Sequence, residues 1–215
     1  MLGHLPILLI ALPLVSAPLC VLLRRRAPAW VLSALVSWLT LGMAGALLAE
    51  VLQSGPVSYA LGSWSAPWGI EYRVDAVNAF VLLLVSLIGA VVVLGAPASI
   101  AAELPRMRGN LSYAAWLLCL SGQLGMVATG DAFNVFVFLE ISSLSSYALV
   151  GMGPDRRALS ASFRYLVMGT IGGTFFVTGV GLLYMMTGTL NMADMAGRLP
   201  AVRPVAEAKL IPSIA

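Results

Sequence analysis

A single glutamate inside an apolar segment is the residue of this sequence best placed to do chemistry. Glu140 stands near the middle of the apolar run Phe133 to Val150. An acidic side chain at the centre of a membrane-spanning helix costs about 2.5 to 3.5 kcal/mol, and such carboxylates tend to mark ion or proton paths. The position therefore predicts proton or cation transfer at Glu140. The alternative is a structural carboxyl that stays protonated and hydrogen-bonds a neighbouring helix.

Three further polar side chains are candidates to assist Glu140. Residues three and seven positions apart share one face of a helix, so Ser143 and Tyr147 should lie beside it and could bond the carboxylate or hold water. Gln123, in the middle of the preceding apolar segment, could begin a hydrated path at similar depth. Serine and glutamine also support close packing between membrane helices, so a packing role stays open for both types.

Other kinds of reactive site have no motif in the sequence. It contains no glycine-rich phosphate loop, no paired cysteine or histidine spacing for a metal, and no nucleophile with a second histidine to serve it. We therefore expect no enzymatic activity of its own, no cofactor and no bound metal. Cys20 and Cys119 both fall in apolar runs and are interpreted as small buried residues without a disulfide.

Composition places the chain in a membrane. Of its 215 residues 60% are hydrophobic and only 10% are charged, whereas soluble domains carry about 25% charged residues. The mean hydropathy is +0.96. A net charge of +3 would suggest an anionic partner in a soluble protein, but here the arginines cluster between apolar runs. They indicate membrane topology and argue against nucleic-acid binding.

The apolar runs predict an all-α integral membrane protein with six spanning helices. A spanning helix needs about 20 mainly apolar residues, and six segments meet this requirement: Leu5–Leu23, Ala29–Leu52, Val77–Ile100, Leu111–Thr129, Ala132–Val150 and about Leu159–Thr187. Residues 1–190 would form the six-helix bundle, and residues 191–215 a polar C-terminal tail that does not span. Gly169 and Gly173 have the spacing of a close helix-packing face.

The longest interior connection, residues 53–75, predicts a small β-hairpin on the outer surface. Val57–Leu61 and Ile70–Val74 are short alternating stretches separated by turn residues. Trp64 and Trp68, which lie between them, are interpreted as part of an aromatic belt at the membrane interface.

The arginines predict the orientation. One set of connections holds most of them, whereas the other set holds Arg73 and the C-terminal stretch. Basic connections stay in the cytoplasm, which would leave both termini outside. The arginines assigned to the cytoplasmic side are Arg24, Arg25, Arg26, Arg106, Arg108, Arg156 and Arg157.

Several strings of the sequence resemble one family of transport proteins. These are GDAFNVFVFLEISSLSSYALVGMG (residues 130–153), ASFRYLVMGTIGGTFF, LLYMMTGTLNMADMA and, in the outer loop, LGSWSAPWGIEYRVDAVNAF (residues 61–80). Together, and in their order along the chain, they are similar to the D-type subunit of the Mrp class of multisubunit cation/proton antiporters. The same subunit type recurs in membrane-bound hydrogenases and, more distantly, in respiratory complex I.

The resemblance implies a proton path through a multi-pass subunit of a prokaryotic plasma membrane complex. Its partners would be other subunits, lipid, protons and a monovalent cation. In that family the glutamate matched by Glu140 is the essential proton-transfer group and works against a lysine on a seventh helix. Lys209 lies among polar residues and prolines and is not interpreted as that lysine. We therefore expect the N-terminal part of such a subunit, split or truncated, which does not transport ions alone.

Two alternatives stay open at this point. One is a subunit of a redox-driven proton pump of the hydrogenase or NADH dehydrogenase type, in which the local residues would be the same. The other is a structural membrane scaffold in which Glu140 is inert.

Overall fold

The fold is a bundle of long helices with one small hairpin. The computed structural model describes residues 4–23, 25–104 and 109–210, with side chains up to residue 201. Within these ranges six helices are long and apolar enough to cross a membrane, which confirms the predicted all-α membrane fold. They are α1 (Leu5–Leu22), α2 (Arg26–Ser54), α3 (Ala76–Glu103), α4 (Gly109–Ala128), α5 (Ala132–Gly151) and α6 (Arg156–Thr187). The predicted polar tail is largely helical, as α7 (Met192–Leu210), and is not among these six.

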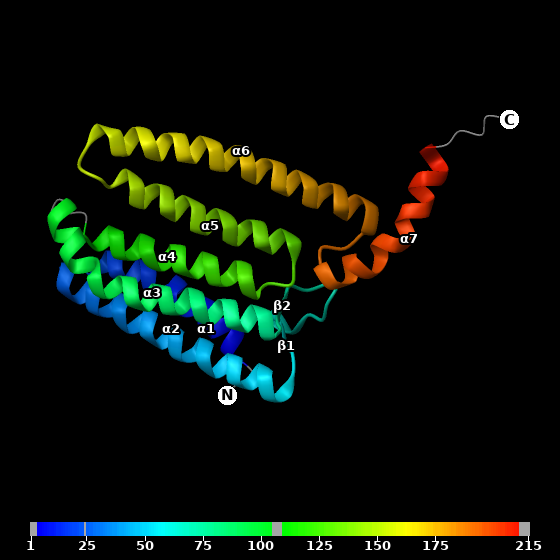
Figure 1. The fold of residues 1–215 in the computed structure, drawn as a ribbon, viewed down its shortest axis with the longest axis horizontal. Coiled ribbons are helices and arrows are strands. Elements are labelled where there is room, and N and C mark those ends of the chain that lie inside the picture. The colour runs from blue at the N-terminus through cyan, green and yellow to red at the C-terminus, as the bar shows by residue number, and fades with distance from the viewer. Residues whose placement is uncertain (1–3, 24, 105–108, 211–215) are drawn as a thin grey trace.

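The helices lie side by side, with α4 at the centre and α6 at one edge (Figure 1). α4 packs against α1, α3 and α5, whereas α6 packs mainly against α5. Accordingly 67% of an apolar 18-residue stretch of α4 is buried, whereas only 11% of the corresponding stretch of α6 is buried. Large aliphatic side chains such as Leu47, Leu82 and Leu124 fill the core between the inner helices. α5 is thus the layer between a buried core helix and an exposed edge helix.

The hairpin forms where the sequence predicts it. β1 (Val57–Ala60) pairs antiparallel with β2 (Glu71–Val74), with Val57 opposite Val74. The short 3-10 turn η2 (Leu61–Ser63) follows β1. Trp64 and Trp68 between the strands are exposed, as an interfacial aromatic belt requires.

Asx residues start the helices at the hairpin end of the bundle. The side chain of Asp75 accepts a hydrogen bond from the Asn78 amide ahead of α3, at 2.8 Å. Asn191 does the same ahead of α7, accepting from the amides of Ala193 and Asp194. These caps satisfy amides that the first helical turn leaves without partners. The α3 and α7 starts are therefore defined locally by sequence.

The described arginines of the interhelical connections segregate as predicted. Arg26 donates to the carbonyl of Leu104 at 3.0 Å, which joins the start of α2 to the end of α3. The α5–α6 turn, with Arg156 and Arg157 at the start of α6, lies at this same end, opposite the hairpin that holds Arg73 (Figure 1). Arg24, Arg106 and Arg108 lie outside the described residues. Which end faces the cytoplasm stays a prediction.

Both cysteines are free and buried, as interpreted from the sequence. Cys20 lies against the carbonyl of Ala29, and Cys119 against the hydroxyls of Ser142 and Ser146 on α5.

Candidate functional site

α5 presents two different faces to its two neighbours. Toward α4, Phe138 and Ser142 pack so closely that a β-carbon added at Gly122 would come to 2.8 Å from the Phe138 carbonyl oxygen and 2.7 Å from the Ser142 nitrogen. On this face the Ser145 and Ser146 hydroxyls donate to backbone carbonyls one turn earlier. Serines on the α4 side therefore serve packing. The other face, toward α6, carries Glu140.

The Glu140 carboxylate lies directly against Gly173 of α6. A β-carbon added at residue 173 would come to 2.5 Å from Glu140 Oε1 and 3.5 Å from Phe136 Cε2. Gly173 is buried although most of α6 is exposed, because this contact covers it. The predicted close-packing face of α6 is thus confirmed, and the group that it packs against is the candidate carboxylate.

Tyr147 reaches the same face of α6 one turn away. Its hydroxyl lies on Gly169, where an added β-carbon would collide with it. The Tyr147 ring is only 6% exposed and packs edge-on against the ring of Tyr165 from α6, with centroids 4.7 Å apart. Gly169 and Gly173 are separated by one helical turn, about 6 Å along the axis. The structure therefore gathers the Glu140 and Tyr147 side chains at one interface, as their spacing predicts.

The Glu140 carboxylate has no hydrogen bond or ion pair with any side chain of the described residues. Ser143 is half-buried on the same side of α5, and its hydroxyl makes no hydrogen bond to the carboxylate in the described chain. Glu140 is itself half-buried. A carboxyl with a purely structural role would be expected to have a hydrogen-bonding partner at such a site. Here that partner is absent from the described part of the chain.

Gln123 does not join this group. It lies on α4 beside a groove of about 590 Å³ between α3 and α4, whose lining includes Gly89, Trp116 and Cys119. Its amide points to the sulfur of Cys119, at 3.8 Å. Because the α4-facing side of α5 is occupied by Phe138 and Ser142, the groove and Glu140 lie on different sides of the α4–α5 pair. The predicted pairing of Gln123 with Glu140 in one path therefore has no support in the geometry.

A polar cluster at the hairpin end was not recognised from the sequence. Glu71 of β2 accepts hydrogen bonds from the Ser58 hydroxyl at 2.5 Å and from the Asn191 amide group at 2.9 Å. The backbone of Glu71 also accepts from Gly130, and Met192 donates to Gly130, so that β2, the α4–α5 turn and the α6–α7 turn are joined. These contacts hold the start of α5 to the start of α7.

A repeated pattern in the sequence could have revealed this cluster. Thr129, Asp131 and Asn134 have the same spacing as Thr189, Asn191 and Asp194. In each turn the threonine hydroxyl accepts from the backbone amide two residues later, at 3.3 Å. The side chain of the second residue of each turn, Asp131 or Asn191, then caps the helix that follows. The two turns meet in an antiparallel bridge between Asp131 and Asn191.

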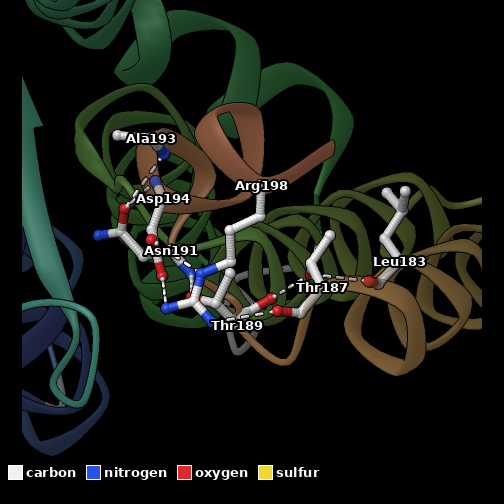
Figure 2. A network of polar contacts seen from close by, with 7 residues as sticks. All are labelled: Leu183, Thr187, Thr189, Asn191, Ala193, Asp194 and Arg198. Carbon is white, nitrogen blue, oxygen red and sulfur yellow. Dashed lines mark hydrogen bonds and ion pairs between the residues drawn. The ribbon is translucent and has the colours of Figure 1, made fainter. Parts of the chain in front are cut away.

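The first turns of α7 are held to the end of α6 by one arginine (Figure 2). Arg198 pairs with Asp194 through Nη2 at 2.8 Å and Nε at 3.0 Å, and its Nη1 donates to the Thr187 carbonyl at 3.2 Å. That carbonyl belongs to the last turn of α6, which lacks helical amide partners. α7 is thereby tied to the helix that contacts Glu140.

Burial changes the acidity of two groups in this cluster. It raises the pKa of Asp131 above its ordinary value of 3.8, although the amides of Asn134 and Phe133 oppose the shift by hydrogen-bonding the carboxylate. Burial also raises the pKa of Tyr72 in β2, although a hydrogen bond with the Asn134 side chain opposes this shift. Both groups lie outside the spanning helices and are buried, which suits a structural role.

The sequence also holds a second acidic residue inside a predicted span that was not singled out. Glu50 lies one turn before the end of α2, at the hairpin end. One of its carboxylate oxygens is buried without a hydrogen bond from the described residues. A charged residue inside the predicted span Ala29–Leu52 was the signal that could have identified Glu50.

Comparison with known proteins shows where related sequences occur. Residues 129–208 match the family model described as NADH:quinone oxidoreductase/Mrp antiporter, TM. The N subunit of the NADH-quinone oxidoreductase of Desulforudis audaxviator (strain MP104C) is 43% identical over 93% of this chain and 40% of the relative. The D-type subunit of the Na(+)/H(+) antiporter of Bacillus subtilis (strain 168) is 33% identical over 90% of this chain and 39% of the relative.

A solved structure agrees with these relatives. A chain of the membrane-bound sulfane sulfur reductase, an archaeal respiratory membrane complex, superposes with a TM-score of 0.86 at 33% identity. The match covers 94% of this chain and 41% of that chain. In each of these comparisons the present chain spans about two fifths of the length of the protein that it matches.

Proposed function

The chain belongs to the antiporter-like membrane subunits that Mrp antiporters share with NADH:quinone oxidoreductases, and on that premise we propose that it conducts protons within a larger membrane complex. Glu140 is the group that takes up and releases the proton. Other subunits of the complex are its partners, and a monovalent cation is the ion exchanged for protons. The complex lies in a prokaryotic plasma membrane, with the hairpin and the N-terminus outside.

The observation that carries the proposal is the state of the Glu140 carboxylate. It lies at the α5–α6 interface of a membrane-spanning helix, half-buried and without a hydrogen bond or ion pair from the described residues. Among the described residues, neither charge pairing nor a fixed hydrogen bond holds it in one protonation state. A carboxyl in such a position can exchange a proton with water or with a group brought by a partner. An inert scaffold gives no reason for placing an unpaired acid there.

The chemistry requires only that Glu140 alternates between two forms. When a positive charge approaches within about 4 to 6 Å, the ionised form is favoured and a proton leaves; when the charge withdraws, the carboxylate is protonated again. Tyr147 and Ser143 lie on the same side of α5 and can order water beside the carboxylate. The positive charge comes from another part of the complex.

A redox-driven pump is the second candidate, and the comparisons give it specific weight. The NADH-quinone oxidoreductase relative is 43% identical to this chain, against 33% for the antiporter relative. The site residues would act in the same way in both complexes, since only the source of the driving charge differs. Mass spectrometry of the subunits that co-purify with the chain separates the two candidates: redox subunits indicate a pump, and their absence from an active complex indicates an antiporter.

The test of the proposal is Glu140→Gln in the assembled complex. The substitution keeps the size and hydrogen-bonding capacity of the side chain and removes the titratable group. Proton movement in sealed membrane vesicles, followed with a pH-sensitive dye, should fall to background while the complex assembles normally. Glu140→Asp should retain partial activity, because the proton-accepting group remains on a shorter side chain.

Glu103→Gln is the matched control, since Glu103 is an exposed acid at the end of α3. It should leave proton movement unchanged. Wild-type rates in the Glu140→Gln complex would return Glu140 to a structural role and remove the basis of the proposal.

A further inference from the structure

Gly173 leaves room for the Glu140 carboxylate and for little else. Of the atoms near an added β-carbon, only Glu140 Oε1, at 2.5 Å, is closer than ordinary contact, whereas Phe136 Cε2 and Glu140 Cδ are at 3.5 and 3.6 Å. Oε1 is the far end of a flexible side chain. A methyl group at residue 173 would therefore displace the carboxylate and leave the two helices at their present separation.

Gly169 makes the equivalent contact with a stiffer side chain. The Tyr147 hydroxyl lies on it, and an added β-carbon would also come to 2.7 Å from Tyr147 Cζ. The ring is buried and packed against Tyr165, so it cannot turn away easily. By contrast, a β-carbon at Gly172 or Gly179 of the same helix would meet nothing within 4 Å.

From these contacts we propose that Gly173 and Gly169 are positioning residues, which set the Glu140 carboxylate and the Tyr147 hydroxyl on one face of α6, a single turn apart. The inference rests on the proposed function of Glu140 in proton transfer. α6 then acts on the reaction without a reactive side chain of its own: the absence of a β-carbon at two positions determines where two polar groups of α5 lie.

Gly173→Ala in the assembled complex tests the main claim, with Gly172→Ala as its control. Both replace a glycine by alanine in the middle of α6, so both make the same change in helix propensity. Gly173→Ala should lower the rate of proton movement by about tenfold or more, because displacements near 1 Å at a reacting group can cost about 100-fold. Gly172→Ala should keep the wild-type rate, and both complexes should assemble to the wild-type level.

A second measurement on the same complexes does not depend on transport. A hydrophobic carbodiimide modifies protonated carboxyls within membranes, and mass spectrometry gives the extent of reaction at Glu140. Gly173→Ala should change the reaction rate at Glu140, whereas Gly172→Ala should not. If Glu140→Gln transports normally but this reactivity changes, the positioning holds and the proposed function fails. If both alanine variants match wild type in reactivity and transport, the positioning inference is wrong.

Paired substitutions ask whether the contact itself is responsible. Glu140→Asp shortens the side chain and makes room for the methyl group of Gly173→Ala, so the double variant should be more active than the product of the two single effects predicts.

The second pair tests the contact between Tyr147 and Gly169. Gly169→Ala should lower the thermal stability of the complex, and Tyr147→Phe should restore part of that stability by removing the colliding hydroxyl. Strict additivity in both pairs would contradict the inference.

Discussion

The carboxylate of Glu71 in β2 accepts a hydrogen bond from the amide group of Asn191 at 2.9 Å, across 120 residues of sequence. This bond links the hairpin to the turn that begins α7. Asn191 is only 4% exposed and has a second role, because its Oδ1 caps α7 by accepting from two backbone amides. The same side chain thus starts a helix with its oxygen and attaches that helix to the hairpin with its nitrogen.

The two roles of Asn191 can be separated by Asn191→Asp. Aspartate caps helices as well as asparagine does, so α7 should still form. The bond to Glu71 is lost and replaced by repulsion between carboxylates, which should destabilise the protein by about 1 to 3 kcal/mol. Thermal unfolding in detergent gives the loss of stability, and hydrogen exchange at residues 130–132 and 190–192 should show where the contact opens.

The double variant Glu71→Gln with Asn191→Asp serves as the internal control. The new glutamine amide can donate to the new carboxylate, while its oxygen still accepts from Ser58, so the bond is rebuilt with its direction reversed. The double variant should recover most of the stability that Asn191→Asp loses. Equal instability of the double and single variants would mean that this bond does not hold α7.

Asp131 should make stability depend on pH in the direction opposite to that of an ordinary paired carboxylate. Burial raises its pKa in the folded protein above 3.8, so the folded state holds the proton more tightly than the unfolded state does. The stabilisation from this group is fully present below the unfolded pKa and is lost as the pH rises through the folded pKa. Asp131→Asn removes this dependence and keeps an acceptor for the Asn134 amide.

Melting temperatures measured from pH 3 upward in wild type and Asp131→Asn should therefore converge toward the acidic end, and the variant should be at least as stable at neutral pH. Asp131→Ala removes the cap as well and should be less stable than Asp131→Asn by about 1 kcal/mol at every pH. If Asp131→Asn at neutral pH loses as much stability as Asp131→Ala, the ionised carboxylate is needed and the prediction is wrong.

The spans and the hairpin were predictable because each has a local signal. Apolar length identifies a spanning helix such as α3 whatever it packs against. Alternation and turn residues located both strands of the hairpin to within one residue. Glu140 was identifiable for a similar reason, since a charge inside an apolar run is conspicuous without any knowledge of its neighbours.

The relations between helices were less accessible. Helical spacing placed Tyr147 on the same face as Glu140, but it could not show that Gly169 and Gly173 of another helix receive these two side chains. Depth alone also suggested a partnership with Gln123, and this stays a prediction, because depth does not say which side of a helix a residue takes. Gln123 faces the groove toward α3, whereas Glu140 faces α6.

The orientation in the membrane follows from the arginines together with the fold. Exposed Ser63 at the hairpin end and exposed Asp155 at the start of α6 lie at opposite ends of the bundle (Figure 1). Since Arg25, Arg26, Arg156 and Arg157 gather at the end that holds Asp155, that end should be cytoplasmic. Single cysteines at Ser63 and Asp155, introduced into a Cys20→Ala, Cys119→Ser background, report the two ends separately.

A membrane-impermeant thiol reagent applied to intact cells should label the cysteine at residue 63 and spare the one at residue 155. Permeabilised cells should label both, which controls for accessibility, and the cysteine-free background should label at neither position. Serine is a suitable replacement at residue 119 because the sulfur there contacts the hydroxyls of Ser142 and Ser146, which a new hydroxyl can also bond. Labelling of residue 155 alone in intact cells would invert the orientation, and labelling of both would mean that the two ends do not lie on opposite sides of the membrane.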